Sequence, residues 1–252
     1  MSCSIPQEIL DLIVDHLHDE PTTLKACCVV SRSWIHRTRT HLFARVEFHA
    51  PKSHVELWKK IFPDPSRSPA HHTRHLSIRG IALVTAADAD SAGGWIRTFN
   101  NLVHLRLHSI DFKSDHRASL VPFHGLSPTL TSLHLSYTSL EVLDLLCSFP
   151  LLEDLALVFF NLSGGDVWDT PSTSPKLTGS LELSGLAPIR PAVRRLLSFP
   201  GGLHFANITV SCPDEDVRST MDLVSRCSDT LESLTTDHHT PGAFTLAPMS
   251  GQ

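Results

Sequence analysis

Residues 102–107 read Leu-Val-His-Leu-Arg-Leu, and residues 130–135 read Leu-Thr-Ser-Leu-His-Leu. The apolar-x-apolar pair that ends this motif recurs along the chain at spacings of 22 to 29 residues. Because alternate side chains of a strand point to opposite faces, each pair predicts a short strand with two side chains in a common core. The pairs are Leu76/Ile78, Leu105/Leu107, Leu133/Leu135, Leu155/Leu157, Leu181/Leu183, Ile208/Val210 and, more weakly, one at Leu234.

The segments between the predicted strands include three with helical periodicity. Apolar residues recur at helical spacing in 140–149, 192–199 and 214–227, which predicts a helix in each of these return paths. A period in the twenties combined with Leu-x-x-Leu-x-Leu resembles the leucine-rich repeat family. The resemblance implies a solenoid in which successive units stack on one continuous core.

The resemblance is to an irregular member of that family. Its repeats usually carry Asn or Cys three residues after the second strand leucine, whereas this chain has Ile110, Thr138, Phe160, Leu186 and Pro213 there. Without a ladder of asparagines, the turns must pair their buried backbone groups in another way. The alternative is an α/β domain whose strands and helices are not repeats.

The first 48 residues show a different pattern, which predicts three short helices. Pro6 suits a first helical turn, and Ile9, Ile13 and Leu17 recur at i, i+4 and i+8 on one helical face. A second apolar helix runs through residues 24–34. Helices this short bury little apolar surface, so we expect part of the apolar face to pack on a partner or on the following domain.

This segment resembles an F-box, the helical motif that attaches substrate receptors to a Skp-type adaptor. The matching residues run in order as Ile5-Pro6-x-Glu8-Ile9, Ile13-Val14, Leu17, Leu24, Val30-Ser31-Arg32-Ser33-Trp34 and Leu42-Phe43, with Ile5 where the family usually has Leu. The resemblance implies that the adaptor links the chain to a cullin-RING ubiquitin ligase of the SCF type. The adaptor contacts that it implies are Pro6, Ile9, Ile13, Val14, Leu17, Leu24, Val30 and Trp34.

These patterns together predict an α/β fold class, with an N-terminal three-helix F-box-like module followed by an irregular leucine-rich-repeat solenoid. The predicted divisions are the module at 1–48, a helix and Pro-rich linker at 49–73, the repeats at 74–236 and a poorly ordered tail at 237–252. Thr170 and Ser174 each precede a proline in a loop, a pattern of proline-directed phosphorylation sites, although a plain solvated loop is the simpler interpretation.

The polar residues between the apolar positions form the opposite, open face of the predicted strands. The first rows of this face are rich in histidine and arginine, and its later rows are acidic or neutral. Because the concave faces of solenoids bind partners, we expect a target protein there; a merely solvated polar face is the alternative. The candidate substrate-binding residues are His75, His104, Arg106, His108, His134, Asp154 and Glu182.

Composition argues against several classes of partner. The net charge of −5 offers no basic field for nucleic acid or for an anionic membrane, and no run approaches the roughly 18 apolar residues of a membrane span. Six scattered cysteines without a Cys-x-x-Cys pair favour a reducing compartment, so we expect a cytoplasmic or nuclear protein. His104 and His108 have a ligand-like spacing, but two rings on one strand lie too far apart to chelate easily, so we expect no metal.

The sequence contains no nucleophile elbow, phosphate-binding loop, dinucleotide fingerprint or zinc-protease helix. We therefore expect no catalytic residue, no enzyme activity and no cofactor. The predicted function is the substrate-recognition subunit of an SCF-type E3 ubiquitin ligase, which docks a Skp-type adaptor through the F-box and binds an unidentified target protein on the repeats. The alternatives are a non-catalytic interaction scaffold that does not engage an adaptor, and a hydrolase with an unrecognised site.

Overall fold

The computed structural model describes residues 5–49, 51–80, 95–110, 123, 126, 128–138, 140–158, 175, 177–185, 189–212 and 217–238. Thr170, Ser174 and residues 239–252 of the predicted tail lie outside the described residues.

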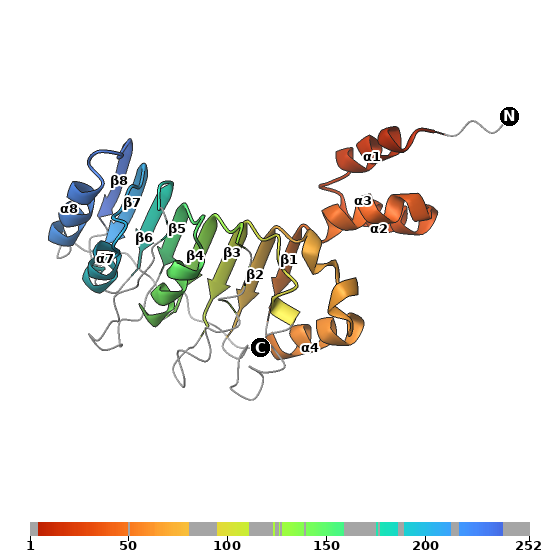
Figure 1. Cartoon of the computed structure of the whole chain (residues 1–252), viewed down its shortest axis with the longest axis horizontal. Helices are drawn as coiled ribbons and strands as arrows, with labels where there is room; N and C mark the ends of the chain where they lie inside the picture. Colours follow the sequence, from red (N-terminus) through yellow and green to blue (C-terminus); the bar gives the residue numbers. More distant parts are fainter. Residues whose placement is uncertain are drawn as a thin grey trace, which may run out of the picture.

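Within this part of the chain, eight parallel strands form one sheet in the order of the sequence (Figure 1). Neighbouring strands are in register, so that Leu76, Leu105 and Leu133 stand side by side in adjacent strands. The strands are β1 (Arg45–Phe48), β2 (His75–Arg79), β3 (His104–His108), β4 (Ser132–Ser136), β5 (Asp154–Val158), β6 (Ser180–Ser184), β7 (Asn207–Cys212) and β8 (Ser233–His238).

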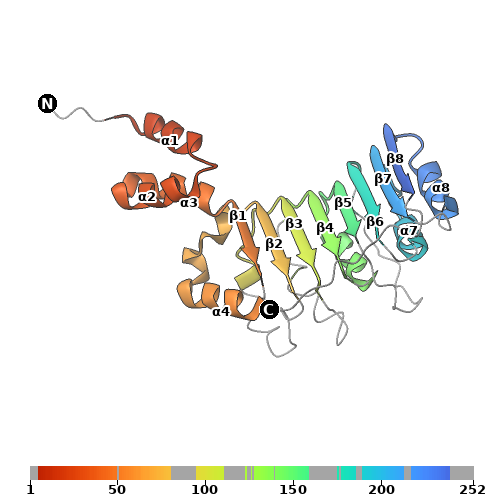
Figure 2. The same ribbon diagram turned by 180° about the vertical axis from the view of Figure 1, so that it is seen from behind.

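Helices precede the sheet and connect its strands. The first three, α1 (Gln7–His16), α2 (Pro21–Val30) and α3 (Arg32–Leu42), extend beyond the β1 end of the sheet, as both views show (Figures 1 and 2). Between strands lie α4 (Pro51–Ile61), the 3₁₀ helices η1 (Pro65–Arg67), η2 (Pro69–His72) and η3 (Leu140–Ser148), and the helices α7 (Arg190–Leu197) and α8 (Val217–Arg226). The three return helices predicted from periodicity are therefore confirmed as η3, α7 and α8.

The core of the sheet is built from the apolar pairs of the strands. Every apolar pair of β2 to β7 is at most 1% exposed, which confirms these predicted strands. Val193 and Leu196 of α7 and Leu223 of α8 join the same core. Burial of the apolar strand residues is weakest at β8, the last strand described, where Leu234 is 44% exposed.

Aromatic rings close the core at its β1 end. Trp58 of α4 meets Phe43 and Phe48 edge to face, with ring centroids 6.2 and 5.7 Å apart. The same indole stacks on Phe99 at 5.7 Å. Strand β1 and helix α4 therefore pack into the same apolar core as the other strands.

The predicted architecture is wrong. We expected a helical module followed by an irregular leucine-rich-repeat solenoid, whereas the described residues form a single all-parallel sheet with helices, an α/β arrangement. The sheet begins at Arg45, directly after α3, and β1 pairs with β2 through Val46 and Leu76. The error has a physical reason: an apolar-x-apolar pair reports only which face of a strand is buried, and it does not say which larger architecture contains the strand.

Candidate functional site

Helices α1 to α3 have a small core of their own. Val14, Leu24 and Cys27 are buried, and they are not part of the apolar cluster that fills the sheet. Thr38 is also buried, and its hydroxyl donates to the carbonyl oxygen of Trp34 at 2.7 Å. Val14 and Leu24, two of the predicted adaptor contacts, therefore hold the three helices together.

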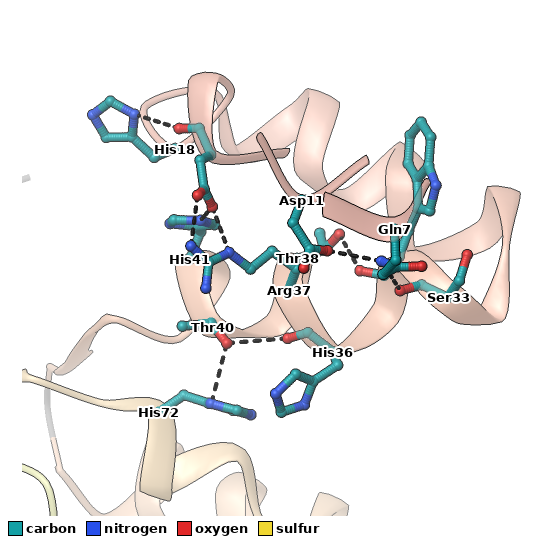
Figure 3. A network of polar contacts seen from close by, with 12 residues as sticks. Gln7, Asp11, His18, Ser33, His36, Arg37, Thr38, Thr40, His41 and His72 are labelled. Atoms are coloured by element: carbon teal, nitrogen blue, oxygen red, sulfur yellow. Dashed lines mark hydrogen bonds and ion pairs between the residues drawn. The ribbon is translucent and has the colours of Figure 1, made fainter. Parts of the chain in front are cut away.

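An ion-pair network at Asp15 fastens α1 to α3. Figure 3 labels its two partners on α3, Arg37 and His41. The Asp15 carboxylate accepts two hydrogen bonds from the Arg37 guanidinium, each 2.5 Å long. The Nε2 of His41 lies 2.7 Å from the same carboxylate. The hydrogen bonds from Arg37, together with those of His41, hold the pKa of Asp15 well below its usual range.

Polar contacts also fix the start of α1 and join α3 to the body of the protein (Figure 3). The Gln7 side-chain amide donates to Asp11 at 2.8 Å and to the carbonyl oxygen of Ser33 at 3.4 Å. Near the C-terminal end of α3, the Thr40 hydroxyl lies 3.4 Å from His72 Nδ1. The Gln7–Ser33 contact therefore ties the start of α1 to α3, and the Thr40–His72 contact ties α3 to η2.

The outer side of α1 exposes large apolar side chains. Ile9 and Ile13 are 47% and 42% exposed, and Leu12 between them is 56% exposed. Because positions i, i+3 and i+4 of a helix are neighbours, these three residues form one apolar face, which we call the α1 face. At the end of α2, Val30 is 67% exposed.

The predicted adaptor contacts thus divide into three groups. Pro6, Ile9, Ile13 and Val30 are exposed, Leu17 and Trp34 are half-buried, and Val14 and Leu24 are buried. Sequence reasoning missed Leu12 and also Val29, which is 86% exposed. The position of Leu12 at i+3 from Ile9 was the signal that could have found it.

The polar face of the sheet contains a second feature, a hollow of about 320 Å³ across β1 to β4. Four of the predicted substrate-binding residues line it, namely His75, His104, Arg106 and His134. His75 and His104 are neighbours in the register of β2 and β3, and their rings stack with centroids 4.3 Å apart. Burial lowers the pKa of His134 to about 4, so this ring is neutral at pH 7.

The other three predicted substrate-binding residues do not line the hollow. His108 lies one row away, where its Nδ1 is 2.7 Å from the Ser136 hydroxyl. Asp154 accepts a hydrogen bond from the Ser180 backbone N–H at 2.7 Å, which joins β5 to β6. Glu182 is exposed on β6.

The candidate list drawn from the sequence omitted four polar residues of the hollow, Arg45, Glu47, Ser77 and Ser132. Arg45 and Glu47 belong to β1, which was assigned to the helical module. The pair Val46-x-Phe48 lies 30 residues before Leu76 and was the signal for this strand. Recognising β1 would have placed both residues beside His75 and Ser77, their partners in the register.

Several kinds of site are absent from the described part of the chain. No group of three or more His, Cys, Asp or Glu side chains within it could hold a metal ion. None of the helices described is long and apolar enough to cross a membrane. Neither a protein-family model nor a curated protein matches the sequence.

Proposed function

We propose that this chain is the substrate receptor of an SCF-type cullin-RING E3 ubiquitin ligase. Helices α1 to α3 dock a Skp-type adaptor, and the polar face of the sheet binds the target protein. The chain itself has no catalytic role, and it accelerates ubiquitin transfer by holding the target near the enzymes of the complex.

The exposed α1 face is the observation that carries this proposal. Ile9, Leu12 and Ile13 are large apolar side chains on a helix of ten residues, and about half of each remains in contact with solvent. Contiguous apolar surface of this kind marks sites of protein association. The resemblance to an F-box names the class of partner, because Ile9 and Ile13 match positions of that motif.

The rigidity of the three helices also supports docking by this face. The Asp15–Arg37 ion pair and the small core around Val14 fix α1 on α3 before any partner arrives. A preorganised surface loses less conformational entropy on binding, which favours affinity.

The adaptor-binding proposal can be tested by replacing Ile9 and Ile13 with alanine together. Truncating apolar side chains that anchor an interface weakens binding. A purified Skp-type adaptor should therefore bind this variant at least about tenfold more weakly. A matched control is Val217→Ala with Met221→Ala on α8, two exposed apolar residues with the same i, i+4 spacing.

Both double variants should melt at nearly the wild-type temperature, since all four side chains are substantially exposed. Equal adaptor binding by the Ile9/Ile13 variant and the wild type would contradict the proposal. No adaptor binding by either protein would favour the alternative of a scaffold that does not engage an adaptor.

The target-binding half of the proposal needs its own experiment. His104, Arg106 and His134 can be replaced by alanine together, and the proteins that copurify with this variant and with the wild type compared by mass spectrometry. We expect adaptor recovery to be unchanged and one or more other proteins to be lost. An identical set of copurifying proteins would contradict a role of this face in target binding.

A further inference from the structure

Strand β1 leaves one edge of the sheet unpaired. It pairs with β2 alone among the described strands, and Figures 1 and 2 show it at the end of the row. The carbonyl oxygen of Ala44 accepts hydrogen bonds from the N–H groups of Arg74 and His75, each 2.9 Å long, so Ala44 points toward β2. Because main-chain groups alternate in direction along a strand, those of Arg45 and Glu47 point outward. No described residue forms a hydrogen bond with them there, so they can pair with another strand.

An apolar groove of about 370 Å³ lies beside this edge, between β1 and α4, and we call it the β1 groove. Its lining includes every residue of β1 and none of β2, which places it on the outer side of the strand. Leu57 and Ile61 of α4 line it one helical turn apart, and they are 53% and 57% exposed. Phe43 and Trp58, both partly buried, complete its apolar wall. Apolar surface and unpaired main-chain groups therefore lie side by side.

The exposed side chains of β1 alternate in charge along the same edge. Arg45 and Glu47 are exposed on the polar face, and Val46 between them is buried. Arg45 forms no ion pair with a described residue, and Glu47 lies 3.0 Å from Nε2 of the exposed His49. The N–H group of His49 donates to His54 Nδ1 of α4 at 3.3 Å, so the unpaired stretch of the edge ends before His49. The open edge therefore presents one positive and one negative side chain.

We infer that the β1 groove binds an extended segment of a partner protein, which joins the sheet as a further strand beside β1. Such a strand lies about 4.8 Å from β1 and exchanges main-chain hydrogen bonds with Arg45 and Glu47. One set of its alternating side chains falls over Leu57 and Trp58 in the groove, and the other set falls on the polar face. A helix does not fit this edge, because its own main-chain groups are already paired internally.

The charges of β1 specify the chemistry of the segment. Opposite charges that face each other across two strands stabilise the pairing, and like charges destabilise it. The segment therefore carries an acidic residue beside Arg45 and a basic residue beside Glu47, with an apolar residue between them that faces the groove. This site is separate from the α1 face, so binding of the segment does not depend on adaptor docking.

The test is titration of the purified full chain with two synthetic peptides, followed by NMR. Both peptides have valine at alternate positions; one carries its charges in the order Lys-Val-Glu, which suits an antiparallel strand, and the other in the order Glu-Val-Lys, which suits a parallel one. We expect saturable binding of one of them, which fixes the direction of the strand, and slower exchange of the Arg45 and Glu47 amides. Methylation of the peptide nitrogens that face β1 removes hydrogen-bond donors and should abolish binding.

Two variants test the side-chain contacts. Leu57→Ala with Ile61→Ala should weaken peptide binding at least about tenfold, because both side chains line the groove. The matched control is Val217→Ala with Met221→Ala on α8, which should bind the peptide like the wild type. Glu47→Lys should weaken binding as well, and replacing the peptide's lysine by glutamate should restore it.

Several results would overturn the assignment. Failure of both peptides to bind, or equal binding of the methylated peptide, would exclude strand addition at β1. Slow exchange of the Arg45 and Glu47 amides in the peptide-free chain at every concentration would mean that another segment of the protein itself covers the edge. Protection that rises with protein concentration would assign the edge to a second copy of the chain. None of these readouts involves the adaptor, so they test the β1 groove independently of the ligase proposal.

Discussion

The two ends of this chain use apolar residues in opposite ways. In the sheet, the apolar pairs of β2 to β7 are almost completely buried. In the N-terminal helices, Val14, Leu24 and Cys27 are the buried apolar residues, while Ile9, Leu12, Ile13 and Val30 remain exposed. Apolar spacing therefore predicts a face, and only packing decides whether the protein itself covers that face or leaves it for a partner.

The largest expected effect on stability comes from replacing a leucine of the sheet by alanine, compared with the same replacement in α1. Leu107→Ala removes a fully buried side chain and leaves a cavity, so it should lower the free energy of unfolding by about 2–5 kcal/mol. Leu12→Ala removes the same atoms from a side chain that is 56% exposed, and it should change stability by less than about 0.5 kcal/mol. Urea unfolding of both variants measures the two losses of stability, and losses of similar size would contradict the expected difference between the two regions.

A smaller effect is expected where two strands of the sheet meet closely. A Cβ atom on Gly179 would lie 2.3 Å from Asp154 Oδ1 and 3.2 Å from the backbone carbonyl carbon of Glu153. Gly179→Ala should therefore displace the Asp154 carboxylate from the Ser180 N–H and destabilise the protein by about 1–3 kcal/mol.

A double-mutant cycle identifies the cause of that loss. In an Asp154→Ala background the clash with the carboxylate is gone, so Gly179→Ala should cost clearly less than it does in the wild type. Additive losses from the two substitutions would mean that Gly179 and Asp154 do not act as a pair.

Acid should weaken the folded sheet through His134. The folded state holds the pKa of His134 at about 4 through burial, whereas the unfolded chain has an ordinary value near 6.5. Between these values the unfolded state binds more protons, so stability is full above about pH 6.5 and falls as the pH drops toward 4. We expect a loss of about 1–2 kcal/mol from this residue.

Asp15 acts in the same direction as His134, but at lower pH. Because folding lowers its pKa, its contribution is present above its unfolded value of about 3.8 and is lost only as the pH falls below it. Urea titrations of wild type and His134→Gln between pH 7 and 4.5 measure the histidine contribution separately. The variant should show a shallower decline, and an unchanged decline would assign the pH dependence to other groups.

The smallest expected effect concerns the network that holds α1 on α3. Asp15→Asn keeps the size of the side chain but removes its charge, so the Arg37 interaction weakens and stability should fall by about 1 kcal/mol. Adaptor binding should weaken at the same time, because α1 is then less firmly held. Unchanged adaptor affinity together with reduced stability would show that the Asp15 network stabilises the fold but does not support adaptor binding.

Local structure was the part of the fold that the sequence predicted well. The strands of β2 to β7 follow from alternation alone, since Leu105-x-Leu107 places two side chains on one face whatever surrounds them. Strand β1 was missed because Val46-x-Phe48 follows α3 so closely that these residues were assigned to the end of the helical segment. The arrangement of strands into one sheet depends on contacts between distant residues, and a local pattern does not contain that information.

The candidate surfaces, like the fold, were predicted only in part. His75 and His104 were placed correctly on one face, because residues of like position in neighbouring parallel strands meet. Asp154 was misjudged, because its hydrogen bond to Ser180 depends on a glycine at the start of the next strand rather than on its own strand. The sequence predicted that part of the apolar surface of the N-terminal helices stays exposed. Which residues of the α1 face remain exposed is decided by the packing of α1 on α3.

Hydrogen exchange with and without a purified Skp-type adaptor tests the proposed docking surface most directly. We expect slower exchange for backbone amides of α1 and α2 when the adaptor is added, with no change for the buried strands β3 to β6. Exchange that stays the same in α1 and α2 at saturating adaptor, or protection confined to the sheet, would contradict it.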